Sequence, residues 1–324
     1  MPEGITRVLV TGANGFVGTA LCERLVKQGI EVRAAVRTGT MASSCSPGVQ
    51  TVEVGDIHVG TDWIVALTGV THVVHLAARV HVMREVARDP LADFRAVNTA
   101  GTENLARQAA ASGVRRFVYV STIKVNGERT SGRVFRADDN PQPQDAYAQS
   151  KLEAERVLNL ISQRSGMETV IVRPPLVYGP GVKGNFLSML RVLRQGWPLP
   201  LASCRNRRSL VGLTNLVSLL EKCVLHPAAA GQVFLVADGE DLSTPELLRK
   251  VAQTLNKQAR LLPCSPALLR LAASAAGRPG IYERLCGSLQ IDAGKTRELL
   301  GWTPPSSVDA ELVRTASWFL ALNR

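Results

Sequence analysis

The cysteine pattern lacks the spacings that mark metal and redox sites. The six cysteines form no Cys-x-x-Cys pair and no cluster with histidine that has the pattern of a metal site. They are Cys22, Cys45, Cys204, Cys223, Cys264 and Cys286. Cysteines without such spacing usually behave as small buried hydrophobes. We therefore predict six reduced packing residues and no metal site.

Long apolar runs are also missing. No run reaches the roughly 18 residues that a membrane helix needs. The N-terminal segment has the pattern of a core strand rather than that of a signal peptide. The sequence therefore predicts no membrane insertion, and the cytoplasm is the default location.

Acidic residues and aromatics are both scarce. Lys and Arg number 38 against 27 Asp and Glu, which gives a formal net charge of +11, while aromatics make up only 5%. The basic residues are scattered apart from short clusters such as residues 205–208, and no aromatics alternate with them to stack on bases. We therefore expect no nucleic-acid partner. Part of the charge suits small anionic ligands, and the rest is solvated surface.

A glycine-rich turn stands near the N-terminus. Residues 8–18 read as an apolar strand that ends in Gly12, Gly15 and Gly18 and continues into a helix. Free N–H groups and the helix dipole at such a turn attract phosphate, and glycine lets the pyrophosphate approach the backbone. The spacing makes the loop one residue longer than the standard dinucleotide fingerprint. An ordinary strand-to-helix turn is the alternative, and the position of the glycines between strand and helix favours dinucleotide binding.

Residues 146–151 place Tyr147 and Lys151 four positions apart, which is one face of a helix. A free tyrosine loses its proton near pH ~10, and a nearby cation lowers that value. The pair therefore predicts a proton donor, although an amphipathic helix with a solvated lysine has the same spacing.

A second apolar strand, at residues 115–121, ends in the hydroxyls of Ser121 and Thr122. Ligands of open α/β sheets bind at the carboxyl ends of the strands, so these hydroxyls belong at the binding crevice. Hydroxyl residues also simply cap strands and turns, and the combination with Tyr147 and Lys151 decides between the two interpretations.

Strands and helices alternate along the first half of the chain. We expect strands at about 6–11, 30–36, 50–54, 72–76, 115–121 and 168–172, with helices near 16–28, 88–112 and 145–165. This alternation predicts an α/β fold with a Rossmann-type, doubly wound parallel sheet. After residue 174 the pattern becomes irregular, with helices expected near 184–195, 243–256, 265–276 and 307–323.

These segments together resemble the extended short-chain dehydrogenase/reductase family, the NAD-dependent epimerases and dehydratases that act on nucleotide sugars. The resemblance spans nearly the whole chain. It includes residues 8–18, 75–78, 98–102, 121–122, 147–151, 173–180, 208–211 and 295–304. It implies a Rossmann domain at residues 1–173 plus about 210–236. A smaller, discontinuous substrate lobe would comprise residues 174–209 and 237–324.

The resemblance also assigns roles to residues. It implies catalysis by Thr122, Tyr147 and Lys151, with Lys151 lowering the Tyr147 pKa and binding the nicotinamide ribose. Cofactor-binding positions would be Gly12, Asn14, Gly15, Phe16, Val17, Gly18, Arg37, Asp56, Ile57, Leu76, Ala77, Ala78, Asn98, Tyr147, Lys151 and Val177. Substrate-binding positions would be His81, Ser121, Thr122, Asn185, Arg208 and Arg284. Of these, His81 and the last three have an alternative role as packing or surface residues.

Arg37 bears on the choice of cofactor. It follows the second strand, where an acidic residue normally accepts the adenosine ribose hydroxyls of NAD. A guanidinium there can bind a 2′-phosphate through two hydrogen bonds, so we expect NADP(H) to be preferred, with NAD(H) as the alternative. A surface arginine at a strand end would look the same.

The residues after Thr122 narrow the reaction. Sugar 4,6-dehydratases of the family carry an Asp-Glu pair there, because eliminating water needs a further acid and base. This chain has Ile123 and Lys124 instead, so dehydration is not expected. Two reactions at C4 of a UDP-sugar remain. The first is reduction of UDP-4-keto-6-deoxy-N-acetylglucosamine to UDP-N-acetylquinovosamine, favoured by Arg37 and by the similarity of residues 78–83 and 123–127 to that branch. The second is 4-epimerisation of a UDP-hexose with bound NAD.

Two further expectations concern partners and class. The resemblance implies a homodimer formed by the Tyr147 helix and the helix near 88–112. A regulator that binds NADP without catalysis is a remote alternative, because such relatives usually lose the Tyr or the Lys and both are present here.

Overall fold

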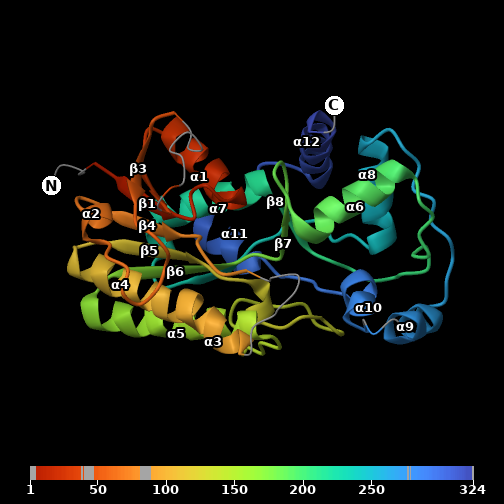
Figure 1. The fold of residues 1–324 in the computed structure, drawn as a ribbon, viewed down its shortest axis with the longest axis horizontal. Helices are drawn as coiled ribbons and strands as arrows, with labels where there is room; N and C mark the ends of the chain where they lie inside the picture. The colour runs from red at the N-terminus through yellow and green to blue at the C-terminus, as the bar shows by residue number, and fades with distance from the viewer. Residues whose placement is uncertain are drawn as a thin grey trace.

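A computed structural model of the chain describes residues 5–37, 39, 47–80, 89–275, 277 and 279–322. Its centre is a seven-stranded parallel sheet in the order β3-β2-β1-β4-β5-β6-β9 (Figure 1). The strands are β1 (Arg7–Thr11), β2 (Glu31–Val36), β3 (Val49–Glu53), β4 (His72–His75), β5 (Arg116–Val120), β6 (Glu168–Arg173) and β9 (Val233–Leu235). The order reverses between β1 and β4, which is where open α/β sheets bind their ligands.

Helices cover both faces of the sheet, as the alternation predicted (Figure 1). One face packs against α1 (Phe16–Lys27), α7 (Leu213–Leu225) and α11 (Gly294–Leu300). The other packs against α2 (Ile64–Leu67), α4 (Thr102–Ala111) and α5 (Ala146–Ser165). Consecutive β1 residues Val8, Leu9 and Val10 are fully buried, because neighbouring side chains point to opposite faces and both faces are covered. The doubly wound α/β fold is thus confirmed.

The helix expected near 88–112 is three shorter elements. They are α3 (Pro90–Phe94), the π-helical segment η2 (Arg95–Gly101) and α4. Asp89 caps the start of α3, where its side chain accepts a hydrogen bond from the Ala92 N–H at 3.0 Å. A Cβ at Gly101 would come within 2.6 Å of the Ile57 side chain, so glycine permits the close approach between η2 and the loop after β3.

The helix α5 crosses between β5 and β6, as predicted for the segment that carries Tyr147. Asp145 caps its start, and its carboxylate accepts a hydrogen bond from the Ala148 N–H at 2.7 Å. Gly166 ends it with a φ of 76°, a conformation that favours glycine. The cap and the glycine fix both ends of the helix.

Beyond β6 the chain builds a second hydrophobic cluster. It contains α6 (Gly184–Gln195), α8 (Thr244–Thr254), α9 (Pro266–Ala275), α10 (Pro279–Cys286) and α12 (Val308–Ala321). A two-stranded parallel ribbon, β7 (Leu176–Tyr178) and β8 (Leu210–Gly212), lies between this cluster and the sheet (Figure 1). Of residues 210–236, only β9 joins the main sheet, because β8 pairs with β7 instead. The exact division into two lobes stays a prediction.

Two cysteines contradict the expectation that all six are reduced. Cys204 and Cys286 form a disulfide, with their Cα atoms 5.5 Å apart. They are 82 residues apart in sequence, so no local cysteine spacing predicts their pairing. Backbone hydrogen bonds between Arg207 and Leu289, and between Ser209 and Leu289, bring the two segments together. Cys22 and Cys223 are buried and outside any disulfide, as expected, Cys264 is half-buried and likewise outside any disulfide, and Cys45 lies outside the described residues.

Two sequence expectations concern absences. No helix in the described ranges is long and apolar enough to cross a membrane. The same ranges hold no group of three or more His, Cys, Asp or Glu side chains placed to bind a metal ion.

Candidate active site

The glycine turn fits a dinucleotide pyrophosphate. Gly12 has a φ of 66°, and a Cβ there would lie 2.9 Å from the Ala77 backbone nitrogen. A Cβ on Gly18 would overlap the Gly12 carbonyl oxygen. Gly15 is the N-cap of α1, and no side chain caps that end, so the first N–H groups of the helix are available to phosphate oxygens. The adjoining Asn14, Phe16 and Val17 complete the predicted loop.

A buried hydrogen-bond chain supports this turn. Thr11 Oγ1 lies 2.7 Å from His75 Nδ1, and His75 Nε2 lies 3.0 Å from Thr102 Oγ1. The Ala77 N–H donates to Thr11 Oγ1 at 3.3 Å, which fixes the backbone of the predicted cofactor-contacting residues Leu76, Ala77 and Ala78. Burial, and to a lesser extent Lys151, lowers the pKa of His75 to about 3. His75 is therefore neutral and serves as a structural link, a role that the sequence did not reveal.

The predicted adenosine end lies on the surface. Arg37 Nη1 is 3.8 Å from Asp56 Oδ1, and about three quarters or more of each side chain is exposed. Ile57 is half-buried beside η2. Among the residues that the structure describes, Arg37 pairs with Asp56 through a long, solvated contact, so its guanidinium is exposed after the end of β2.

Thr122 is arranged to donate a hydrogen bond. Its Oγ1 accepts from the Lys124 N–H at 3.3 Å and caps the turn η3 (Ile123–Val125), so the hydroxyl proton remains for an outside acceptor. Next to it, the buried Ser121 Oγ has no hydrogen-bond partner among the described residues. A buried unpaired hydroxyl is costly, so at the end of β5 it fits a place where a ligand supplies the partner.

Lys151 is buried beneath the site. Its Nζ donates to the Val120 carbonyl oxygen at 2.8 Å and lies 4.4 Å from the centre of the Tyr119 ring. Burial lowers the pKa of Lys151 to about 7, an effect that Glu155 partly opposes. The lysine is therefore poised to change its charge near neutral pH.

Tyr147 is half-buried, with its ring edge against Phe94 at a centroid distance of 5.9 Å. Burial raises the pKa of the Tyr147 phenol above its ordinary value, and the nearby Asp145 carboxylate raises it further. The expected lowering of this pKa is therefore wrong. The physical reason is that removal of phenolate from water outweighs a lysine whose own hydrogen bond goes to Val120.

Asn98 contacts the protein rather than open space. Its amide accepts from the Arg79 N–H at 2.8 Å and donates to the Arg79 carbonyl and to Ser150 Oγ, both at 3.0 Å. These bonds hold η2 against α5 and against the segment after β4. A contact of Asn98 with the cofactor stays a prediction. In the structure, Asn98 links η2 to α5 and to the segment after β4.

The structure brings Arg208 and Arg284 together. Arg208 Nη1 donates to the carbonyl oxygens of Arg284 (3.2 Å) and Gly287 (2.9 Å), and the described residues include no carboxylate paired with Arg208. Burial lowers the pKa of Arg208. A half-buried guanidinium held by carbonyls alone is a suitable anion receptor. Arg284 itself is exposed, and only its backbone makes this contact.

Three predicted positions remain: Asn185 and His81 for the substrate and Val177 for the cofactor. Asn185 is exposed in the first turn of α6, and Val177 is half-buried in β7. His81 lies outside the described residues, so its role stays a prediction.

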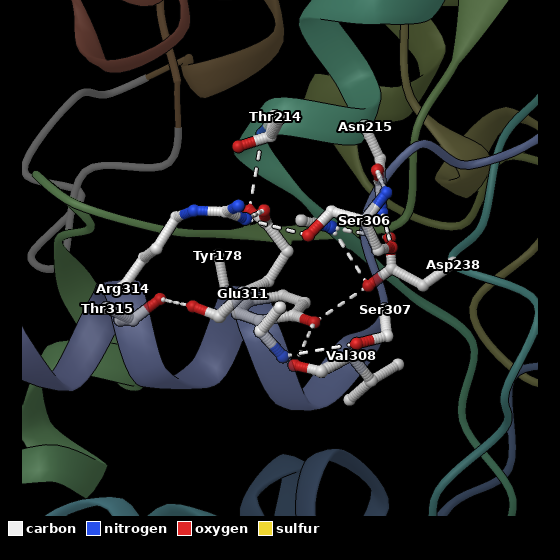
Figure 2. A network of polar contacts seen from close by, with 12 residues as sticks. Tyr178, Thr214, Asn215, Asp238, Ser306, Ser307, Val308, Glu311, Arg314 and Thr315 are labelled. Carbon is white, nitrogen blue, oxygen red and sulfur yellow. Dashed lines mark hydrogen bonds and ion pairs between the residues drawn. The ribbon is translucent and has the colours of Figure 1, made fainter.

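A polar network holds the β7–β8 ribbon in place and was missed from the sequence (Figure 2). The Tyr178 hydroxyl donates to Asp238 Oδ2 at 2.8 Å, while Asp238 Oδ1 accepts from the Gly212 N–H at 2.8 Å and from Asn215 at 2.7 Å. Glu311 of α12 is fully buried and accepts from the Thr214 N–H at 3.3 Å. Tyr178 follows Val177, so the network orients the backbone predicted to contact the nicotinamide carboxamide.

Comparison with known proteins decides the family. Residues 8–237 match the NAD dependent epimerase/dehydratase family. The chain belongs to this family. It is 47% identical over 326 residues to a UDP-glucose 4-epimerase of Vibrio cholerae, covering 100% of this chain and 97% of that protein. A UDP-glucose 4-epimerase of Mycolicibacterium smegmatis is 28% identical over 97% of this chain and 98% of its own length.

Solved structures agree on the fold. A UDP-glucuronic acid 4-epimerase of Bacillus cereus, in complex with NAD, has a TM-score of 0.79 at 20% identity, with 98% of this chain and 100% of that chain covered. A UDP-glucose 4-epimerase of Thermotoga maritima, with UDP-glucose, has a TM-score of 0.78 at 19% identity and the same coverage. The family member described here is therefore an enzyme of the short-chain dehydrogenase/reductase type, as predicted.

Proposed function

We propose that this enzyme transfers a hydride at C4 of a UDP-sugar. The observation that carries the proposal is the state of Thr122. Its hydroxyl oxygen accepts a hydrogen bond from the Lys124 N–H, and its proton would be donated to a substrate oxygen, at the strand end that adjoins the Tyr147 helix. The bound nicotinamide would supply or accept the hydride.

The protein's own residues would handle the proton. In the oxidative direction, Tyr147 takes the proton of the C4 hydroxyl while Thr122 donates a hydrogen bond to the same oxygen. In the reductive direction, Tyr147 returns the proton as negative charge develops on that oxygen. Two preorganised donors at a developing oxyanion stabilise it strongly. Below its pKa of about 7, Lys151 carries a positive charge that favours phenolate.

Redox-neutral 4-epimerisation of a UDP-hexose is the first candidate. It is supported by the similarity, over the full chain, to the Vibrio cholerae protein of that activity. Such a reaction oxidises and re-reduces the same carbon with one bound NAD. NAD is also present in the structure of the similar Bacillus cereus protein.

Net reduction of a UDP-4-keto-6-deoxy-sugar by NADPH is the second candidate. Arg37 favours it, because the exposed guanidinium at the end of β2 suits a 2′-phosphate. Dehydration remains disfavoured, because the dehydratase acid and base positions hold Ile123, which is buried, and Lys124, which is bound to Asp145.

The UDP moiety would lie at Arg208. Its unpaired charge would bind the diphosphate, with Asn185 of α6 and Arg284 of α10 as further contacts.

A homodimer through α4 and α5 is part of the same proposal. Leu152 of α5 is buried in the protein itself, whereas Leu160 is 51% exposed, so packing on the sheet explains only the first of them.

One experiment separates the candidates. The purified protein is incubated with UDP-glucose or UDP-N-acetylglucosamine alone, and separately with UDP-4-keto-6-deoxy-N-acetylglucosamine plus NADPH. Epimerisation gives a second UDP-hexose without change in absorbance at 340 nm, and reduction consumes NADPH. Stoichiometric NADP binding with no turnover of any sugar would instead indicate a regulator and defeat the proposal.

A further inference from the structure

We propose that Lys124 is a positioning residue for the catalytic tyrosine: its ammonium group binds Asp145 and thereby holds the start of α5 against the Thr122 turn. The inference rests on the proposed function, because it assigns a role in the action of Tyr147. Lys124 stands where the dehydratases carry an acid, so the same position would serve a different purpose here.

Lys124 joins the two segments that carry the reacting groups. Its backbone N–H donates to Thr122 Oγ1 at 3.3 Å. Its Nζ lies 2.6 Å from Asp145 Oδ2 and 3.0 Å from Glu128 Oε1. The other oxygen of Asp145 accepts from the Ala148 N–H at 2.7 Å, which caps α5. One side chain therefore ties the Thr122 turn to the first turn of the helix, two residues from Tyr147.

The Lys124–Asp145 contact also changes the charge near the Tyr147 phenol. Asp145 stands two residues before Tyr147, and its carboxylate disfavours the phenolate. The Lys124–Asp145 pair is partly buried, with 39% and 27% of the side chains exposed, so solvent screens it less than a surface pair. Hydrogen bonds to Lys124 and Ala148 lower the pKa of Asp145 despite burial, so the carboxylate stays charged. Lys124 then offsets that charge beside Tyr147.

The other titratable groups near the phenol come from several elements. They are the buried Tyr119 of β5 and Lys151, which stands one helical turn further along α5, while α3 contributes the uncharged ring of Phe94. Glu128, on the turn after β5, also binds Lys124 and lies close to the Asp145 carboxyl that caps the helix. Lys124 is thus the cation that meets Asp145, whereas Lys151 faces Val120.

The test uses the pH dependence of UDP-sugar turnover. Sugar oxidation needs Tyr147 as a base, so Lys124→Met should move the rising limb of kcat to higher pH by about half to one unit. The loss should be about three- to tenfold at low pH and should shrink at high pH. Lys124→Arg should restore the wild-type midpoint, because the positive charge is kept.

Asp145→Asn is the complementary variant. Asn also caps helices well, and its loss of charge should move the midpoint to lower pH. In that background Lys124→Met should shift the midpoint little further. Glu128→Gln is the matched control, since it removes the other partner of Lys124 and should cause no upward shift.

Two results would overturn the proposal. One is an equal drop in kcat at every pH in Lys124→Met, which would leave only a structural role. The other is the absence of coupling between Lys124 and Asp145 in a double-mutant cycle of urea unfolding. We expect this coupling to change the unfolding equilibrium constant by about two- to fivefold. The unfolding cycle needs no substrate, so a protein that turns over no UDP-sugar would defeat the proposed function while the cycle still decides the contact.

Discussion

The Lys151 ammonium donates its hydrogen bond, at 2.8 Å, to the carbonyl oxygen of Val120, the last residue of β5 before Ser121 and Thr122. The bond anchors α5, the helix that also carries Tyr147, to the end of β5, which Thr122 follows. It also places a cation where water does not reach it. The hydrogen bond fixes the position of α5 but removes the Lys151 ammonium from water, and this burial lowers the pKa of Lys151.

The first prediction concerns Tyr147→Phe. Removal of the hydroxyl should lower kcat by about 10²- to 10⁴-fold, because general acid–base catalysis contributes that much, and should leave cofactor affinity near normal. Steady-state turnover and a fluorescence titration with the dinucleotide check the two parts. Tyr282→Phe on α10 is the control and should retain activity. Full activity of Tyr147→Phe would refute the acid assignment.

The second prediction links Lys151 to the pH dependence of stability. The folded pKa is about 7, below the unfolded value near ~10.4, so the unfolded chain binds more protons between these limits. Burial of the Lys151 ammonium therefore destabilises the protein most below pH 7, and this destabilisation disappears as pH rises toward 10. The unfolding free energy of wild type relative to Lys151→Met should increase by on the order of 1–3 kcal/mol from pH 6.5 to 10.

Urea unfolding of both proteins at the two pH values measures this change, and packing differences cancel in the comparison. Lys27→Met, at the exposed end of α1, controls for the loss of a surface lysine. A difference between wild type and Lys151→Met that stays constant with pH would contradict the prediction.

The third prediction concerns Arg208. Its guanidinium has two carbonyl partners and no carboxylate in the described structure, so Arg208→Met should weaken UDP binding by about 10- to 100-fold. Isothermal titration calorimetry with UDP measures the affinity. Arg207→Met is the matched control, because that exposed neighbour pairs with Glu246 at 3.5 Å. Equal losses in the two variants would mean that general charge, not this site, binds the nucleotide.

The fourth prediction tests cofactor choice. Arg37→Asp places a carboxylate where NAD-dependent relatives accept the ribose hydroxyls, so the ratio of NADP to NAD affinity should fall about tenfold or more. Binding titrations with both dinucleotides give the ratio. An unchanged ratio would show that Arg37 is only a surface residue paired with Asp56.

Local patterns were sufficient for the sheet and for the nucleotide turn. The apolar runs that end in Gly12 or in Ser121 predict strands whose carboxyl ends share one edge, because parallel strands all point the same way. The Tyr147–Lys151 spacing predicts a shared helix face, because the period of the helix is fixed. Each of these signals lies within a few residues of sequence, where backbone geometry alone dictates the result.

Contacts between distant segments were not predictable in the same way. Cys204 and Cys286 meet because the segments around Arg207 and Leu289 pair, and Tyr178 meets Asp238 because β7 pairs with β8. In the sequence, Lys124 indicates only that the dehydratase acid is missing, whereas in the structure its Nζ lies 2.6 Å from Asp145 Oδ2. The hydrophobic periodicity of the sequence does not encode contacts between distant segments.

The sequence by itself determined the α/β class, the glycine turn and the identities of Thr122, Tyr147 and Lys151. The tertiary structure alone decided the proton affinities of those residues. A pKa depends on burial and on every charge within a few ångströms, whichever segment supplies it. Lys151 is therefore a weaker base, and Tyr147 a weaker acid, than their spacing on one helix face suggested.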